Sequence, residues 1–399
     1  MLSIVKHIFY KVKYFYRFFL FFLEQMKKVM VYFHVSYICI NGGYTMMRKL
    51  FTVASMLCIA TATFAYNPPI SGETLDRLVS PTQLTYGSSS AGGGIFTAAP
   101  DAIVWNPALV AFEQRITIDA AYTALISTKS EQRFFGSAFQ GGITIPSKWF
   151  IASAVLKGTF LPMSDMHVGN TITTNAAIAK EVSERISVGL GLNGGVFFGA
   201  GSDWQLGANL GVVYRLPVLG FMKDFRVGAS VLNLGKNFTS TTLEGINREK
   251  AVGMFPMIGT VHAGVAALMF STDIVKGGLS LEVYTPCFQN FLTAASFHFS
   301  VNDALYIRIA EEFNLREAIT GHPSYIPAIS IGYSFSFKTK NNNYFKENDW
   351  GQSEMAINAA WQQLYGSVHA ASANVKLTLG MQDTEPPKIE ILFDEEDEQ

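Results

Sequence analysis

The segment that decides the fold is Ile329-Ser330-Ile331-Gly332-Tyr333-Ser334-Phe335-Ser336-Phe337, in which large apolar residues alternate with serine and glycine. Residues 186–193 and 204–214 repeat this alternation. Because the side chains of a strand point alternately to its two faces, each segment predicts a strand with one apolar face. The other face is too small and polar for a protein core, and it carries few charges. The pattern predicts barrel strands with the apolar face against lipid and the polar face toward a lumen.

The composition supports a membrane barrel. The chain has 399 residues, of which 49% are hydrophobic and only 15% are charged, whereas an ordinary soluble domain has about 25% charged residues. From residue 66 onward, no run approaches the roughly 20 uninterrupted apolar residues of a membrane helix. The 34 glycines and 14 prolines follow no repeat, which excludes collagen-like and low-complexity proteins.

Fourteen candidate strands lie between residues 114 and 380. They span 114–125, 135–145, 149–159, 171–182, 186–198, 203–215, 225–234, 258–270, 277–285, 290–301, 304–313, 327–338, 354–363 and 367–380. An even number lets both ends of a barrel finish on the same side of the membrane. The predicted fold class is therefore all-β: a transmembrane antiparallel β-barrel of about 14 strands over residues 111–380. The segment 354–363 fits a short helix equally well.

The connections between these strands alternate in length. Those after odd-numbered strands include the long segments 126–134, 160–170, 235–257 and 314–326, whereas 146–148, 183–185 and 302–303 are short. Outer-membrane barrels have short periplasmic turns and longer external loops. We therefore expect the N-terminus to be periplasmic. The polar segment 339–353 breaks the alternation.

The N-terminal part of the chain contains an export signal. Met46-Met47-Arg48-Lys49 is a positive start, residues 50–59 are apolar, and Thr63-Phe64-Ala65 is a cleavage site with small residues at both ends. We interpret residues 46–65 as a signal peptide. Residues 1–45 are then expected to be mis-assigned upstream sequence, the alternative being a membrane anchor in that stretch.

The charge and cysteine content of the exported chain argue against a nucleic-acid partner and an intramolecular disulfide. Removing residues 1–65 leaves 22 basic and 30 acidic residues, a net charge of −8. Nucleic acid is not expected as a partner, because phosphate neutralisation needs clustered lysine and arginine. Only Cys287 remains after residue 65, so no intramolecular disulfide is expected.

Residues 66–110 lack the strand pattern. Gly87-Ser88-Ser89-Ser90-Ala91-Gly92-Gly93-Gly94 has no periodicity. A barrel of fourteen strands is wider than its own side chains can fill. We therefore interpret residues 66–110 as an N-terminal plug, or hatch, the alternative being a disordered periplasmic leader. Residues 381–399 are expected to form an acidic periplasmic tail.

The sequence contains no catalytic or metal-binding pattern. The GxGxxG match at residues 189–194 lies within a predicted strand, and the histidines after residue 65 show no metal-ligand spacing. We therefore expect no enzyme activity, no metal and no cofactor.

Three charged residues fall on inward faces of predicted strands: Asp119, Glu282 and Arg308. An arginine on the lipid face near the midplane would cost about 2–4 kcal/mol, so Arg308 is expected in the lumen or at the rim. These side chains either contact a transported ligand or pair with the plug and with one another. We favour pairing.

The segment Ala91-Gly-Gly-Gly-Ile-Phe-Thr-Ala-Ala-Pro-Asp-Ala-Ile-Val-Trp-Asn-Pro-Ala-Leu-Val-Ala111 carries a family pattern. A glycine/alanine-rich stretch, an acidic residue, an aromatic residue and Asn-Pro-Ala resemble the FadL-like outer-membrane transporters, closest to a spirochaetal uncharacterised branch. The resemblance implies a hatch-plugged barrel of fourteen strands that passes long-chain fatty acids or other hydrophobic small molecules by passive diffusion. Of the family's functional positions, it carries over Asn106, Pro107 and Ala108. Gly158 is a candidate for the family's kinked exit strand.

The expected partners are hydrophobic small molecules such as fatty acids, outer-membrane lipid, and the barrel-assembly machinery during insertion into the bacterial outer membrane. Two other functions stay open. One is a barrel that shuttles or anchors exported surface proteins. The other is a surface adhesin or antigen whose barrel displays loops such as 235–257.

Overall fold

A computed structural model describes residues 79–85, 89–127, 135–160, 170–198, 202–238, 258–288, 290–320, 326–337, 353–364 and 368–380. The expected upstream sequence, signal peptide and acidic tail lie outside these residues, as do positions 66–78 of the expected plug. Among the described residues, no helix combines the length and apolar character needed to cross a membrane.

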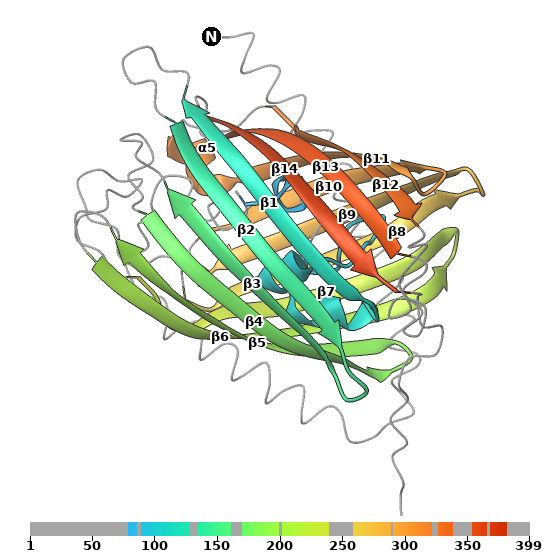
Figure 1. Cartoon of the computed structure of the whole chain (residues 1–399), viewed down its shortest axis with the longest axis horizontal. Coiled ribbons are helices and arrows are strands. Elements are labelled where there is room, and N and C mark those ends of the chain that lie inside the picture. The colour runs from blue at the N-terminus through green and yellow to red at the C-terminus, as the bar shows by residue number, and fades with distance from the viewer. Residues whose placement is uncertain are drawn as a thin grey trace, which may run out of the picture. The chain divides into compact units, whose positions relative to one another are not determined.

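Fourteen antiparallel strands close into a barrel, with each strand paired to its neighbours in sequence and β1 paired to β14 (Figure 1). This confirms the predicted fold class and shows that the segment 354–363 belongs to a strand and not to a helix. The strands are β1 (Ile116–Ser127), β2 (Phe135–Pro146), β3 (Ile151–Phe160), β4 (Asn170–Ser183), β5 (Ile186–Phe198), β6 (Ser202–Leu219), β7 (Met222–Lys236), β8 (Thr260–Ser271), β9 (Val275–Pro286), β10 (Leu292–Val301), β11 (Leu305–Asn314), β12 (Ala328–Phe337), β13 (Ser353–Leu364) and β14 (Val368–Leu379).

Strands β6 and β7 extend further than the sequence predicted. The predicted strands end at residue 215 and begin at residue 225, but the pairing continues to Leu219↔Met222. Gly220, with a φ of +63°, takes the left-handed backbone conformation in the two-residue turn. An ion pair of 2.8 Å between Arg215 and Asp224 joins the two strands. This turn is one of the short connections at one end of the barrel.

The outer face of the barrel is apolar. Along β5, Val188, Leu190 and Leu192 are exposed, while the residues between them are buried. The same alternation exposes a belt of large apolar residues around the wall: Ile118, Tyr122, Leu156, Ile178, Leu206, Leu210, Ile309, Ile329, Ile331, Tyr333, Ile357 and Val375. Such a surface fits a lipid bilayer, which confirms the predicted transmembrane barrel.

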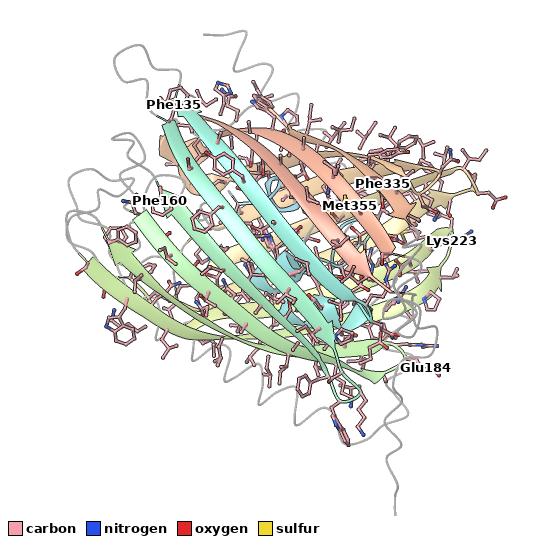
Figure 2. All side chains as sticks on the ribbon, viewed as in Figure 1. Phe135, Phe160, Glu184, Lys223, Phe335 and Met355 are labelled. Carbon is pink, nitrogen blue, oxygen red and sulfur yellow. The ribbon has the colours of Figure 1, made fainter. Side chains whose placement is uncertain are left out.

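The two ends of the barrel differ. Figure 2 labels Phe135 and Phe160 at one end and Glu184 and Lys223 at the other. The second end, called here the short-turn end, contains the connections 184–185, 220–221, 272–274 and 302–304. The connections 128–134, 161–169 and 237–259 belong to the first end and are longer, whereas 338–352 is a long connection at the short-turn end, as the break in the alternation predicted. Four short helical elements complete the described part: α4 (Pro81–Leu84), η1 (Pro100–Val104), η2 (Pro107–Phe112) and α5 (Leu315–Thr320).

The apolar belt predicts that a charge on it destabilises the barrel according to depth. Leu192 is 62% exposed in the middle of β5, whereas Ile186, on the same face, begins that strand. We expect Leu192→Arg to lower the free energy of unfolding by about 2–4 kcal/mol in lipid vesicles, and Ile186→Arg by about 0–1 kcal/mol. Guanidinium titrations of the vesicle-inserted protein measure both values, and equal losses would contradict the membrane-spanning orientation.

Candidate functional site

Residues 79–85 and 89–112, called here the inner segment, lie within the ring of strands (Figure 1). Elements η1 and η2 contact β3 and β4, η2 also contacts β5 and β6, and α4 contacts β12, β13 and β14. Three kinds of contact hold this segment against the wall: apolar packing, the close approach of its backbone to wall glycines, and side-chain hydrogen bonds.

Apolar packing joins η1 and η2 to one side of the wall. Ile103 and Val110 form a buried cluster with Ile151 and Val155 of β3 and with alanines of β4. Leu109 packs with Val213 of β6 in a second buried cluster. The inner segment therefore buries most of its large apolar side chains against the wall.

Glycines on the inner face form seats for the backbone of the inner segment. A Cβ atom on Gly189 would overlap the backbone of Pro107 and Ala108, and one on Gly228 would overlap the carbonyl of Ser90. Gly278 lies in the same way against Gly94. A backbone obstacle cannot be relieved by a side-chain rotation, so at these positions the wall requires residues without a side chain.

Asn106 ties the inner segment to the barrel. Its Nδ2 donates hydrogen bonds to the carbonyl oxygens of Ser90 (2.7 Å), Val212 (3.1 Å) and Ala229 (3.4 Å). Its Oδ1 accepts from the backbone N–H of Ala108 at 2.9 Å and thereby caps η2, whose first residue is Pro107. Asn106 therefore separates η1 from η2.

The carboxylate of Glu282 is hydrogen-bonded to the inner segment and does not face an open part of the lumen. Its carboxylate accepts hydrogen bonds from the N–H (3.1 Å) and Oγ (2.7 Å) of Ser90, and it lies 3.1 Å from Nδ1 of His262. The ring of His262 stacks on Tyr284, and the indole of Trp105 meets both rings edge-on. Glu282 is thus a structural link between β9 and the inner segment.

Asp119 and Arg308 lie elsewhere on the inner face, so the three predicted lumen residues do not form one site. Asp119 accepts hydrogen bonds from the amides of Gln140 (2.9 Å) and Asn374 (2.7 Å) and is buried. Arg308 donates to Oδ1 of Asn358 at 3.4 Å. Only Arg308 lines the cavity described next.

A cavity of about 280 Å³ opens between the inner segment and the wall at the short-turn end. Five cationic and three acidic side chains line it: Arg115, Arg215, Arg226, Arg308, Lys376, Glu113, Asp224 and Glu354. Arg115 pairs with Glu113 (3.3 Å) and with Glu354 (3.1 Å), and Asp224 pairs with Arg215 and Arg226. The cavity is polar and carries more positive than negative charge.

Arg226 and Lys376 were not among the predicted lumen residues, although their positions in the strands indicated an inward orientation. Arg226 shares the inward parity of Gly228 and Ser230, and Lys376 shares that of Asn374. Both residues fall near the ends of predicted strands, where a charged residue reads as part of a solvated rim.

Gly158 is not at a kink. Strand β3 pairs with β2 from Ser137↔Phe160 to Pro146↔Ile151, and with β4 from Ile151↔Ala179 to Thr159↔Thr171, without a register shift. The ring of Phe139 covers Gly158. Register shifts occur between β4 and β5, β6 and β7, β7 and β8, and β8 and β9.

Comparisons with known proteins give structural neighbours but no sequence relative. No family model and no curated protein matches the chain. The CymD monoaromatic hydrocarbon channel is 11% identical, with a TM-score of 0.47 over 80% of this chain and 100% of its own. The Pseudomonas putida toluene transporter TodX is 13% identical, with a TM-score of 0.45 over 80% and 100%. A Pseudomonas aeruginosa FadL homologue is 12% identical, with a TM-score of 0.42 over 74% and 96%.

The glycine seats predict how the inner segment can be displaced. We expect Gly189→Ala to push the backbone at Pro107 away from the wall and to raise the conductance of the barrel in planar bilayers at least severalfold. Gly141→Ala is the matched control, because a Cβ at Gly141 meets no atom within 4 Å. Equal conductance of the two variants would contradict the seating of the inner segment.

Asp101 predicts a pH dependence of the inner segment. Its carboxylate accepts a hydrogen bond of 2.6 Å from Ser80, but burial dominates and raises the pKa of Asp101 above the ordinary 3.8. The docked state therefore holds the proton to higher pH than the undocked state does. Docking is strongest below pH 3.8, weakens as the pH rises from 3.8 to the raised pKa, and stays weaker above it.

We accordingly expect amide exchange in residues 100–112 to be faster at pH 8 than at pH 5, after correction for intrinsic exchange. Asp101→Asn is uncharged at both pH values and should exchange at the slower, corrected rate throughout. Hydrogen-exchange mass spectrometry of the vesicle-inserted protein measures this, and a wild-type difference that persists in Asp101→Asn would exclude Asp101 as its source.

Proposed function

We propose that this chain is a bacterial outer-membrane transporter that takes up hydrophobic small molecules, with residues 66–110 as its hatch. Long-chain fatty acids are the first candidate substrates. The observation that carries the proposal is a closed barrel with an apolar outer face, whose inner wall holds residues 89–112 on glycine seats. The resemblance of residues 91–111 to FadL-like transporters supports the substrate class.

Passive diffusion suits this architecture. A ligand that moves down its gradient needs a path past the hatch and no energy-coupling site. The inner segment is joined to β3, β4 and β6 by apolar packing, which a hydrophobic ligand replaces without leaving a polar group unpaired. Asn106, Pro107 and Ala108 would then keep the hatch attached while this packing is exchanged.

The architecture of the barrel wall supports a location in the bacterial outer membrane. Bacterial outer-membrane barrels are closed antiparallel sheets with an even number of strands, short turns at one end and longer loops at the other. The same architecture would require the barrel-assembly machinery for insertion. The short-turn end then faces the periplasm.

Identification of the molecules that co-purify with the protein tests this function directly. We expect the protein extracted from outer membranes in mild detergent to co-purify with a hydrophobic class of small molecules, detected by mass spectrometry. A general porin prepared from the same membranes is the control for bulk lipid. We expect at least tenfold enrichment over that control.

The alternative functions give other results. A profile identical to that of the porin would contradict hydrophobic uptake. A co-purifying exported protein without enriched small molecules would instead support the protein-shuttling barrel. Host-cell binding that is lost only when residues 235–257 are exchanged would support the adhesin.

A further inference from the structure

The cationic cavity at the short-turn end has a composition that hydrophobic uptake does not explain. Its walls come from the inner segment, from β6 and β7, and from β11 to β14. Apart from Phe96, Phe112 and a few alanines, its lining is polar or charged. A site for an apolar ligand normally has predominantly apolar walls with a few placed polar groups, so this cavity points to a different ligand.

Arg226 is the most informative residue of the cavity. Its side chain is 1% exposed, and its Nη2 donates to the carbonyl oxygen of Gly93 at 2.7 Å. The guanidinium carbon lies 4.9 Å from the ring centre of Phe96, which fixes the plane of the group. Its Nη1 is buried and has no hydrogen-bond partner. A buried guanidinium N–H without an acceptor is costly. Arg226 lines the cavity and shares a single carboxylate, Asp224, with Arg215, so an anion in the cavity would neutralise the remaining positive charge.

Arg308 and Lys376 add two further cations to the cavity. Arg308 is 5% exposed and donates a long hydrogen bond of 3.4 Å to Asn358. Lys376 donates to the carbonyl oxygen of Ala98 at 3.1 Å. Among the described residues, no carboxylate lies within ion-pair distance of either side chain. Glu113, Asp224 and Glu354 pair with other arginines. Asp119, which lies opposite Lys376 across β1 and β14, accepts hydrogen bonds from Gln140 and Asn374.

We propose that this cavity binds a small hydrophilic oxyanion, with phosphate or carboxylate groups held by Arg226, Arg308 and Lys376. The guanidinium group of an arginine can donate two parallel hydrogen bonds to such oxygens, and the ammonium group of a lysine supplies a compact positive charge. Asn358, Asn374 and Thr378 add polar side chains to the wall around the site. The protein would thus carry a second ligand site, distinct in chemistry from the hydrophobic path.

The polar and charged walls of the cavity favour a free anion over the head group of a long amphiphile. An alkyl chain that followed its head group into this space would lie among charged side chains. A carboxylate with a long chain should therefore bind no better than a short one.

Titration of the whole protein in lipid nanodiscs with inorganic phosphate tests the proposal. We expect saturable binding by isothermal titration calorimetry. Arg308→Gln and Lys376→Gln should each weaken it about tenfold, the effect of losing one charge-assisted hydrogen bond. Arg308→Lys should retain part of the affinity. Lys223→Gln is the control, since Lys223 is an exposed cation at the same end that does not line the cavity (Figure 2).

Competition identifies the source of the oxyanion. Acetate and decanoate should displace phosphate at similar concentrations. Absence of saturable phosphate binding would overturn the proposal, and so would equal affinity in Lys223→Gln and Arg308→Gln. Displacement by decanoate at far lower concentration than acetate would also overturn it, because the cavity would then receive the head group of an amphiphile. None of these outcomes bears on whether hydrophobic molecules co-purify.

Discussion

Closure of the sheet is the constraint on which the rest of the molecule depends. Strand β1 pairs with β14 from Ile116↔Leu379 to Ser127↔Val368, so no strand presents an open edge. In lipid, an unpaired backbone N–H or C=O costs several kcal/mol, and only a closed sheet avoids this cost with strands. Closure also creates an interior that fourteen strands cannot fill with their own side chains. The inner segment, its glycine seats and the cationic cavity all follow from that space.

The interior combines two kinds of environment. Beside β3, β4 and β6, the inner segment buries isoleucine, leucine and valine side chains. Toward the short-turn end, it meets arginine, lysine and carboxylates. The hydrogen bonds of Asn106 and Glu282 to Ser90 hold the backbone of the inner segment in place. The inner segment therefore has an apolar environment in one part of the lumen and a charged environment in another.

Much of the wall could be predicted from the sequence, because alternation of period two directly records which face meets lipid. Arg308 and Asp119 were placed on the inner face in this way. Their partners could not be predicted. Glu282 and Ser90 are separated by 192 positions in the chain, and no local pattern brings them together. The continuation of β6 past Pro217 depends on the paired strand β7, which the sequence around Pro217 does not reveal.

The glycine seats make the barrel wall and the inner segment complementary in shape. A glycine at position 189, 228 or 278 contributes little to its own strand and lowers its intrinsic preference for an extended conformation. Its value appears only when Pro107, Ser90 or Gly94 lies above it. An inner segment from another barrel would not match the positions of these glycines. Conversely, this inner segment would overlap the side chains of a wall that lacks them. The two parts are therefore not interchangeable modules, and they are expected to diverge together.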